Sequence, residues 1–498
     1  MSNRFSGILL SITSLPSDYG IGTLGKEAYH FIDFLHRANQ KYWQILPVGP
    51  ISYGDSPYQS FSTFAGNPYL VDLDMLIEKG LLEEDYVKSI DWGNDPEHVD
   101  YGKLYENRFD VLEKAYLRHK EDDSLLNAQD IKNFCNEKKW LDNYSLFMAL
   151  KRYFGMRPWT EWPEEDIRKH QPEAIEKYRN ILSDDIEFFK FIQYLFFSQW
   201  KALKDYAGEK GIKIIGDVPI YVALDSADVW ASPECFLLDE ENLPIEVSGV
   251  PPDAFSADGQ LWGNPLYRWD YMKERGYGWW IDRIAGAFEL YDILRIDHFR
   301  GFESYWAVPY GESAVNGHWV KGPDMDFVGV LSSWFAGHEF IAEDLGYITP
   351  EVAALLSNSG FPGMKVLQFA FDSREESNYL PHTYYNRCVC YTGTHDNTTL
   401  VNWTKDAAKE DVEFAKKYLG VKDEEELDIA IVRAGMSSVA DTFIAQMQDY
   451  LRLDIEGRMN TPGVPHGNWR WRMKKDAITD ELAEYIAEIT KLYGRSCR

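Results

Sequence analysis

The chain has 498 residues, and its 80 acidic side chains outnumber its 51 basic ones, which gives a formal net charge of −29. Proteins that bind nucleic acids or anionic membranes hold phosphate groups with clustered Lys and Arg, and a field this negative opposes both kinds of partner. Neutral or cationic small molecules are therefore the expected ligands. Hydrophobic residues make up 45% and charged residues 26% of the chain, as in folded globular proteins.

The five cysteines lie at scattered positions, which match neither a disulfide framework nor the CxxC spacing of metal sites. The sequence has no run of about 18 apolar residues that could span a membrane, and its first residues do not have the pattern of a signal peptide. We therefore expect a protein of the reducing cytoplasm that binds no metal and no other cofactor. A monomer is the default expectation for the oligomeric state.

Short apolar runs recur along the chain with helical patterns between them, and this alternation predicts a parallel α/β fold. Each run has four to six residues bounded by polar residues, Gly or Pro, as expected of strands that are covered on both faces. Between the first two runs, Ala28, Phe31, Ile32 and Leu35 repeat at helical spacing. The predicted strands are residues 7–12, 42–46, 213–218, 291–296, 340–343, 366–371 and 388–391.

Two long stretches interrupt this alternation. Residues 70–210 have helical patterns, notably at 104–117, 141–154 and 186–203, so we expect a large, mostly helical insertion there. Residues 224–285 are rich in Pro, Gly, Asp and Trp and have little periodicity, which is typical of long functional loops. Residues 480–492 are helical in pattern, so we expect one catalytic domain over 1–498 with no all-β domain at its carboxyl end.

Acidic side chains cluster where four of the predicted strands end. Asp217 and Asp297 end two runs, Glu343 and Asp344 a third, and Asp396 follows the run at 388–391. In a (β/α)8 TIM barrel, the carboxyl ends of the strands converge on one face, where the active site lies. A single Asp after a strand is commonly a helix cap or a turn residue, and this is the alternative for Asp217 and Asp344 above all. The coincidence of several such motifs favours a catalytic (β/α)8 barrel.

Paired carboxylates in a barrel mouth suit the cleavage of glycosidic bonds. One acid must stay ionised to attack the anomeric carbon, and the other must carry a proton for the leaving oxygen. Arg295 shares a strand face with Asp297 and favours its ionised form, although the two could also be only a structural ion pair. Glu343 follows an apolar approach beside another acid, which predicts a raised pKa.

Six motifs stand in a fixed order along the chain: Asp55-Ser-Pro-Tyr58-Gln-Ser, Pro251-Pro-Asp253-Ala-Phe255, Gly259-Gln260-Leu-Trp262-Gly-Asn264-Pro, Arg295-Ile-Asp297-His298-Phe-Arg-Gly, Ala342-Glu343-Asp344-Leu-Gly and Gly393-Thr-His395-Asp396-Asn. Together they resemble the motifs of the 4-α-glucanotransferases of glycoside hydrolase family 77, the amylomaltases or disproportionating enzymes. Further matching stretches, among them Arg458-Met-Asn460-Thr-Pro-Gly, extend the resemblance from near residue 15 to near residue 472. The order of the motifs carries the resemblance, since no single motif is specific.

The resemblance implies three catalytic acids. Asp297 would be the nucleophile that forms a covalent glucosyl-enzyme, Glu343 the general acid/base, and Asp396 the third acid, which binds and distorts the donor sugar. The implied reaction moves a segment of a 1,4-α-glucan or maltooligosaccharide to the 4-position of an acceptor glucan or glucose, with retention of configuration. An α-glucan hydrolase on the same barrel is the alternative, because water can also resolve the intermediate. A glucan-binding protein without catalysis is a third possibility.

The resemblance also implies a set of residues that contact the glucan. They comprise an aromatic platform beside the cleavage point, a loop that covers the groove, and donors that bind the reacting sugar and the carboxylates. The 17 Trp, 31 Tyr and 27 Phe of the chain fit such a ligand, because flat side chains pack on the CH-lined faces of sugars. The implied substrate-binding residues are Tyr58, Asp217, Asp253, Phe255, Gln260, Trp262, Asn264, Arg295, His298 and His395.

Overall fold

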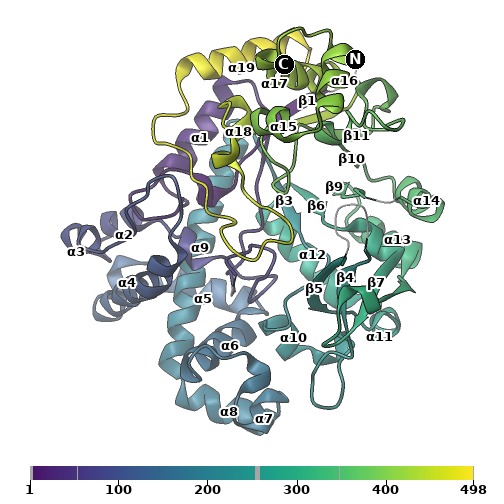
Figure 1. Ribbon diagram of the computed structural model, residues 1–498. Coiled ribbons are helices and arrows are strands. Elements are labelled where there is room, and N and C mark those ends of the chain that lie inside the picture. Colours follow the sequence, from purple (N-terminus) through teal and green to yellow (C-terminus); the bar gives the residue numbers. More distant parts are fainter. Residues whose placement is uncertain (1–3, 53, 253–257, 347, 497–498) are drawn as a thin grey trace.

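Eight parallel strands form the centre of the protein, whose computed structural model describes residues 4–52, 54–252, 258–346 and 348–496 (Figure 1). The strands follow one another in chain order, and the sheet nearly closes into a barrel between β9 and β10. At this junction the N–H of Ala342 donates to the carbonyl of Pro362 at 2.9 Å. The strands are β1 (Phe5–Leu9), β2 (Tyr42–Gln44), β3 (Lys213–Val218), β6 (Ile293–Ile296), β9 (Glu339–Ala342), β10 (Gly363–Val366), β11 (Cys388–Tyr391) and β12 (Thr442–Gln446).

The predicted barrel is thus confirmed, with two differences in its strands. The apolar run at 366–371 is not a strand, because β10 ends at Val366 and residues 367–369 form a 3-10 turn. The strand β12 was missed, although it lies between β11 and β1 in the sheet. Its sequence contains only three consecutive apolar residues, since the buried side chain at its end is the polar Gln446.

Helices surround the barrel, and those predicted from periodicity are confirmed. The helix α1 (Lys26–Arg37) buries Ala28, Phe31, Ile32 and Leu35 against the strands, and α19 (Asp480–Leu492) has the predicted bounds. The other helices outside the insertion are α10 (Ala227–Ala231), α11 (Trp269–Glu274), α12 (Gly278–Leu290), α13 (Asp324–Trp334), α14 (Pro350–Ser359), α15 (Leu400–Asp406), α16 (Lys409–Leu419), α17 (Leu427–Ser437) and α18 (Met447–Tyr450).

Residues 70–210 form helices that extend to the left of and below the barrel in Figure 1. The long helix α9 joins this part to the barrel. The indole of Trp200 in α9 donates to the carbonyl of Leu290, at the end of α12, at 3.0 Å. The helices are α2 (Leu73–Glu78), α3 (Glu84–Lys88), α4 (Tyr101–Glu121), α5 (Ala128–Glu137), α6 (Leu141–Tyr153), α7 (Glu165–Arg168), α8 (Pro172–Ile181) and α9 (Ser183–Glu209).

The stretch 224–285 has more regular structure than its sequence indicated. It contains β4 (Glu246–Val250) and β5 (Gln260–Pro265), which join β7 (Ser304–Pro309) and β8 (His318–Lys321) in an antiparallel sheet of order β5-β4-β7-β8. The prediction of little regular structure was wrong here because Gly, Pro and Asn interrupt the alternating pattern of these short strands. The predicted site residues Asp253 and Phe255 lie outside the described residues.

No helix in the described ranges is both long enough and apolar enough to cross a membrane.

Gly216 in β3 provides a test of how closely the barrel packs beside the site. A Cβ atom at this position would lie 2.1 Å from the ring of Tyr291. We expect Gly216→Ala to lower the free energy of unfolding by about 1–3 kcal/mol, because overpacking forces neighbouring groups apart. Thermal unfolding followed by circular dichroism measures the effect.

Gly208→Ala is the matched control, because Gly208 lies in α9 with no other group within 4 Å of a Cβ built on it. Replacing a helical Gly by Ala stabilises by roughly 0.5–1 kcal/mol. Equal melting temperatures for the two variants would contradict the packing of Gly216 on Tyr291.

Candidate active site

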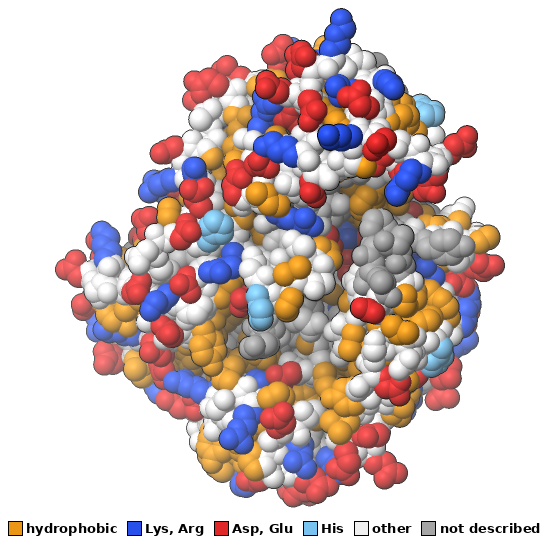
Figure 2. Space-filling model, viewed as in Figure 1, with side chains coloured by type: hydrophobic (Ala, Val, Ile, Leu, Met, Phe, Trp, Pro, Cys, Tyr) orange, Lys and Arg blue, Asp and Glu red, His pale blue; other side chains and the backbone are white. Residues whose placement is uncertain are grey.

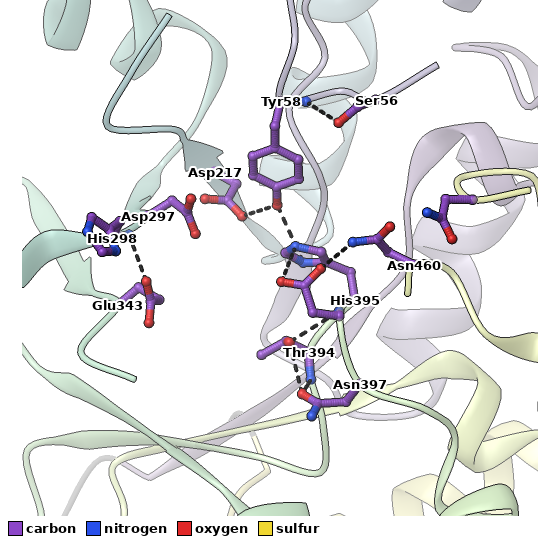
Figure 3. Close-up of polar contacts among 12 residues, drawn as sticks. Ser56, Tyr58, Asp217, Asp297, His298, Glu343, Thr394, His395, Asn397 and Asn460 are labelled. Carbon is purple, nitrogen blue, oxygen red and sulfur yellow. Dashed lines mark hydrogen bonds and ion pairs between the residues drawn. The ribbon is translucent and has the colours of Figure 1, made fainter. Parts of the chain in front are cut away.

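The barrel brings the predicted acids to the carboxyl ends of its strands. Asp217 is the penultimate residue of β3, Asp297 directly follows β6, and Glu343 directly follows β9. These three strands are neighbours in the sheet. Asp396 comes after β11, on the other side of the barrel mouth. Figure 3 shows Asp297 and Glu343 on one side of the site and Tyr58, His395 and Asn460 on the other.

Arg295 lies at the centre of the acids and contacts two of them. One of its guanidinium nitrogens, Nη1, lies 2.7 and 2.6 Å from the two carboxylate oxygens of Asp217 and 2.9 Å from Oδ1 of Asp297. Arg295 and Asp217 are buried, whereas the side chain of Asp297 is 29% exposed. Asp297 is therefore the member of this ion-paired group that a ligand can reach.

Glu343 is in an environment of the opposite kind. Burial and the charge of Asp297 raise the pKa of Glu343 to about 7, against the opposing effects of Arg295 and of two backbone donors. These donors are the N–H of His298 on Oε2 and the N–H of Leu345 on Oε1, both at 2.7 Å. The predicted rise in pKa is thus confirmed. Near neutral pH a large fraction of Glu343 carries a proton that it can donate.

His298 links the loop after β6 to the antiparallel sheet. Its backbone is left-handed, with a φ of 53°, and in this conformation its N–H points to Glu343. Burial lowers the pKa of His298 to about 4, so its imidazole is neutral at physiological pH. Trp262 of β5 packs edge-on against this ring, with the ring centres 4.8 Å apart. The indole of Trp262 donates to Oε1 of Gln260 at 3.2 Å, which fixes both predicted residues beside the site.

Tyr58 and His395 form a stacked pair on the other side of the site (Figure 3). Their ring centres are 5.1 Å apart and the rings are inclined by 25°. The hydroxyl of Tyr58 donates to Oδ2 of Asp217 at 2.8 Å and lies 3.4 Å from Nδ1 of His395. Nε2 of His395 lies 3.4 Å from Oδ2 of Asp396. Burial raises the pKa of Tyr58 well above its ordinary value, so its hydroxyl keeps the proton that it donates.

Two functional residues near the end of the chain were not predicted as site residues. The amide of Asn460 donates to Oδ1 of Asp396 at 2.6 Å. The ring of Trp469 packs against both Tyr58 and His395, at centre distances of 5.7 and 5.8 Å. The motif Arg458-Met-Asn460-Thr-Pro-Gly is part of the resemblance. It has no helical or strand periodicity and follows no predicted strand, so neither signal indicated that Asn460 lies beside Asp396.

Some of the acids and amides at the site are buried and hydrogen-bonded within the protein. Both carboxylate oxygens of Asp217 are used by Arg295, and Oδ2 also accepts from Tyr58. Asn264 is buried, and its amide donates to the carbonyl of Val222 at 3.0 Å. Asp344 is buried and accepts the N–H of Met364 in β10 at 2.6 Å, so this bond is neither a helix cap nor a turn. These groups hold the walls of the site in place.

Figure 2 shows the same face hollowed near its centre, with charged side chains gathered mainly around the periphery. Tyr58, Asp217 and Tyr221 also line a cavity of ≈ 50 Å³ that adjoins the site. Nowhere in the described residues do three or more His, Cys, Asp or Glu side chains form a group that could hold a metal ion.

A parallel barrel that presents a carboxylate paired with Arg295, a carboxyl group with a pKa near 7 and a third acid at its strand ends is typical of enzymes that act on glycosidic bonds. Residues 10–479 match the 4-alpha-glucanotransferase family, glycoside hydrolase family 77, and the chain belongs to this family. The predicted family and enzyme class are therefore confirmed.

Individual relatives are similar over the whole length of the chain. The 4-alpha-glucanotransferase of Clostridium butyricum is 52% identical over 489 residues, which cover 98% of this chain and 100% of that protein. The 4-alpha-glucanotransferase of Thermus thermophilus is 48% identical and covers 96% of each chain. The solved structure of the amylomaltase from Streptococcus agalactiae in complex with acarbose superposes with a TM-score of 0.96, at 43% identity, and covers 99% of this chain and 100% of that one.

The contact between Asn460 and Asp396 predicts a role for a residue that strand patterns do not reveal. We expect Asn460→Ala to lower kcat/KM for glucan transfer about 10- to 100-fold, because a hydrogen bond to a charged group contributes roughly 1.5–3 kcal/mol. Initial rates with maltotriose measure the effect.

Asn180→Ala is the control, since the amide of Asn180 is exposed on α8 and donates only to Glu176. Unchanged activity in Asn460→Ala, or an equal loss in both variants, would reject the assigned role of Asn460.

Proposed function

We propose that this protein is a retaining 4-α-glucanotransferase in which Asp297 is the nucleophile and Glu343 the general acid/base. The observation that carries the proposal is the contrast between the two carboxyl groups. The carboxylate of Asp297 is ion-paired with Arg295 at 2.9 Å and partly exposed, whereas burial and the Asp297 charge raise the pKa of Glu343 to about 7. A retaining enzyme needs these two opposite protonation states in one site.

In the first step, an oxygen of Asp297 attacks the anomeric carbon of the donor sugar. The glycosidic C–O bond breaks, and the leaving oxygen takes the proton of Glu343. The products are a covalent glucosyl-enzyme and a shortened glucan. In the second step, the 4-hydroxyl of an acceptor gives its proton to Glu343 and attacks the same carbon, which releases Asp297 as the anion.

The residues around the two acids hold the donor sugar and the acceptor. Asp396 would accept hydrogen bonds from hydroxyls of the donor, with its orientation fixed by Asn460 and His395. Tyr58, stacked on His395, would provide an aromatic platform, and Trp262, packed on His298, would provide a second one from the antiparallel sheet. Asp253 and Phe255 remain predicted contacts of the covering segment.

Asp217 and Asn264 have a different part in this proposal from the predicted one. Their polar groups are buried and bonded to the protein, so we assign them to positioning rather than to sugar contact. Asp217 would fix Arg295 and Tyr58, and Asn264 would fix the loop that carries Val222.

We further propose glucose as the smallest acceptor, because it carries the required 4-hydroxyl. A monomer in a reducing cytoplasm is the proposed state of the enzyme. The free thiols of Cys135, Cys235, Cys388 and Cys390 support the proposed compartment.

The products formed from maltotriose distinguish transfer from hydrolysis. We expect free glucose together with glucans longer than maltotriose, because a sugar hydroxyl resolves the intermediate. Thin-layer or anion-exchange chromatography of the products shows the ladder. Asp297→Ala should lower the rate of formation of all products by at least about 10³-fold, because no covalent intermediate can form.

Asp130→Ala, at an exposed position of α5, is the control for Asp297→Ala and should give the wild-type ladder. A wild-type ladder with nothing longer than maltotriose would establish hydrolysis instead, and an active Asp297→Ala would reject the nucleophile.

The pKa of Glu343 predicts the pH dependence of the reaction. Below pH 7, Glu343 is mostly protonated and can serve the leaving oxygen, and above pH 7 it loses this proton. We therefore expect kcat/KM for maltotriose to fall as the pH rises through about 7, by about tenfold per pH unit well above it. Deprotonation of His298 cannot cause this fall in kcat/KM, because burial lowers the pKa of His298 to about 4. A rate that is flat between pH 6 and 9 would contradict Glu343 as the acid.

A further inference from the structure

The antiparallel sheet has two faces, and only one of them belongs to the site described above. Successive side chains of a strand point to opposite faces. Trp262 points toward His298, and Tyr305 and Ala307 on the same face are buried in the main core. The opposite face, which we name the outer face, carries a row of residues in register across the four strands. This row consists of Leu261, Gly249, Trp306 and Trp319.

This row is apolar and exposed at its ends, which is unusual for the solvated side of an antiparallel sheet, and the charged Lys321 lies beyond Trp319 on the same face. Leu261 is 52% exposed and Trp319 is 45% exposed. Ile245 and Tyr310, just beyond β4 and β7, are 50% and 51% exposed, and the N–H of Tyr310 donates to the carbonyl of Ile245 at 3.1 Å. Figure 2 shows hydrophobic side chains gathered over these strands, on the right of the view.

The aromatic rings of the outer face are held in fixed positions. The indole of Trp306 donates to the carbonyl of Ala314 at 2.8 Å, and Trp306 packs on a small buried cluster of Val247, Val308 and Ala314. Trp319 packs edge-on against Trp306, with ring centres 5.3 Å apart. Because the rings are already fixed, a ligand would lose little entropy in ordering them.

We infer that the outer face is a second binding surface for the α-glucan, separate from the catalytic site. Four strands at spacings of ~4.8 Å make the row from Leu261 to Trp319 about 14 Å long, the length of several sugar rings. Gly249, between Leu261 and Trp306, is itself buried, so the surface that a sugar can reach lies mainly at the two ends of the row. The CH-lined faces of sugars pack on indole and aliphatic groups of this kind.

The outer face and the catalytic site lie on opposite sides of the same sheet. The guanidinium carbon of Arg300 lies 4.4 Å from the centre of the Trp319 ring. Arg300 belongs to the 3-10 turn Phe299–Phe302, which directly follows His298. The strand β5 also contributes to both places, with Trp262 toward the site and Leu261 on the outer face. A long glucan that occupies both places therefore passes around an edge of the sheet.

A second copy of the chain fits this surface less well than a glucan. The exposed halves of Leu261, Trp319, Ile245 and Tyr310 amount to roughly 400 Å², since a large side chain presents about 150–250 Å². A stable protein interface needs about 800 Å² from each partner. Two copies with a formal charge of −29 each would also repel, whereas an α-glucan is uncharged.

The inference rests on the proposed α-glucan substrate and extends it. A long glucan bound on the outer face raises the local concentration of its own free segments at the catalytic site. Maltotriose is too short to bridge the two places. The surface would therefore favour long glucans over short ones without any change in the catalytic residues.

Trp319→Ala and Leu261→Ser test the inference at the two ends of the row. We expect each variant to weaken binding of soluble amylose about fivefold or more in affinity gel electrophoresis, because each removes a packing face for the sugar. The kcat/KM for maltotriose should stay within about twofold of wild type, since the catalytic site is unchanged. Trp334→Ala is the matched control, because Trp334 is a 66% exposed Trp at the end of α13.

Each outcome decides the inference. Amylose binding like that of wild type in both variants would overturn it, as would an equal loss in Trp334→Ala. A wild-type dimer that Trp319→Ala converts to a monomer in light scattering would show a self-interface and also overturn it. If Trp319→Ala unfolds at a lower temperature than the wild type, the amylose binding of Leu261→Ser decides the inference. The maltotriose ladder of the wild type reports the proposed function independently, so a failure of one proposal is distinguishable from a failure of the other.

Discussion

The ion pair of Arg295 with Asp217 and Asp297 is the interaction on which the rest of the site depends. A buried cation must be paired, and the fully buried Asp217 provides the permanent partner. Arg295 can then face the more exposed Asp297 without being itself exposed to water. The same negative Asp297 contributes to the raised pKa of Glu343. One guanidinium thus pairs with two acids of the site, one of them buried and the other open to a ligand.

The fold could be predicted from the sequence where strands are short and mostly apolar. The runs at 213–218 and 388–391 coincide with β3 and β11, because strands covered on both faces tolerate few polar residues. Prediction failed for β12, where Gln446 is buried but bonded within the barrel. It also failed for β4 and β5, whose short strands contain Gly249, Gly263 and Asn264.

The sequence predicted those residues of the site that come directly after strands. Asp297 and Glu343 were found because strand ends meet at one face of a barrel. Asn460 and Trp469 were not, because their positions depend on how the segment after α18 folds across the barrel mouth, and that path has no local sequence pattern. The resemblance placed Asp217 and Asn264 near the substrate, but only the hydrogen-bond partners reveal that both are buried.

The position of β12 between β11 and β1 has a consequence for how the protein folds. The first strand of the chain pairs on one side with residues 442–446, from Phe5↔Thr442 to Leu9↔Gln446. A ribosome must therefore synthesise almost the whole chain before the sheet can be completed. Until then, one side of β1 exposes unpaired backbone groups, which is the state most open to aggregation.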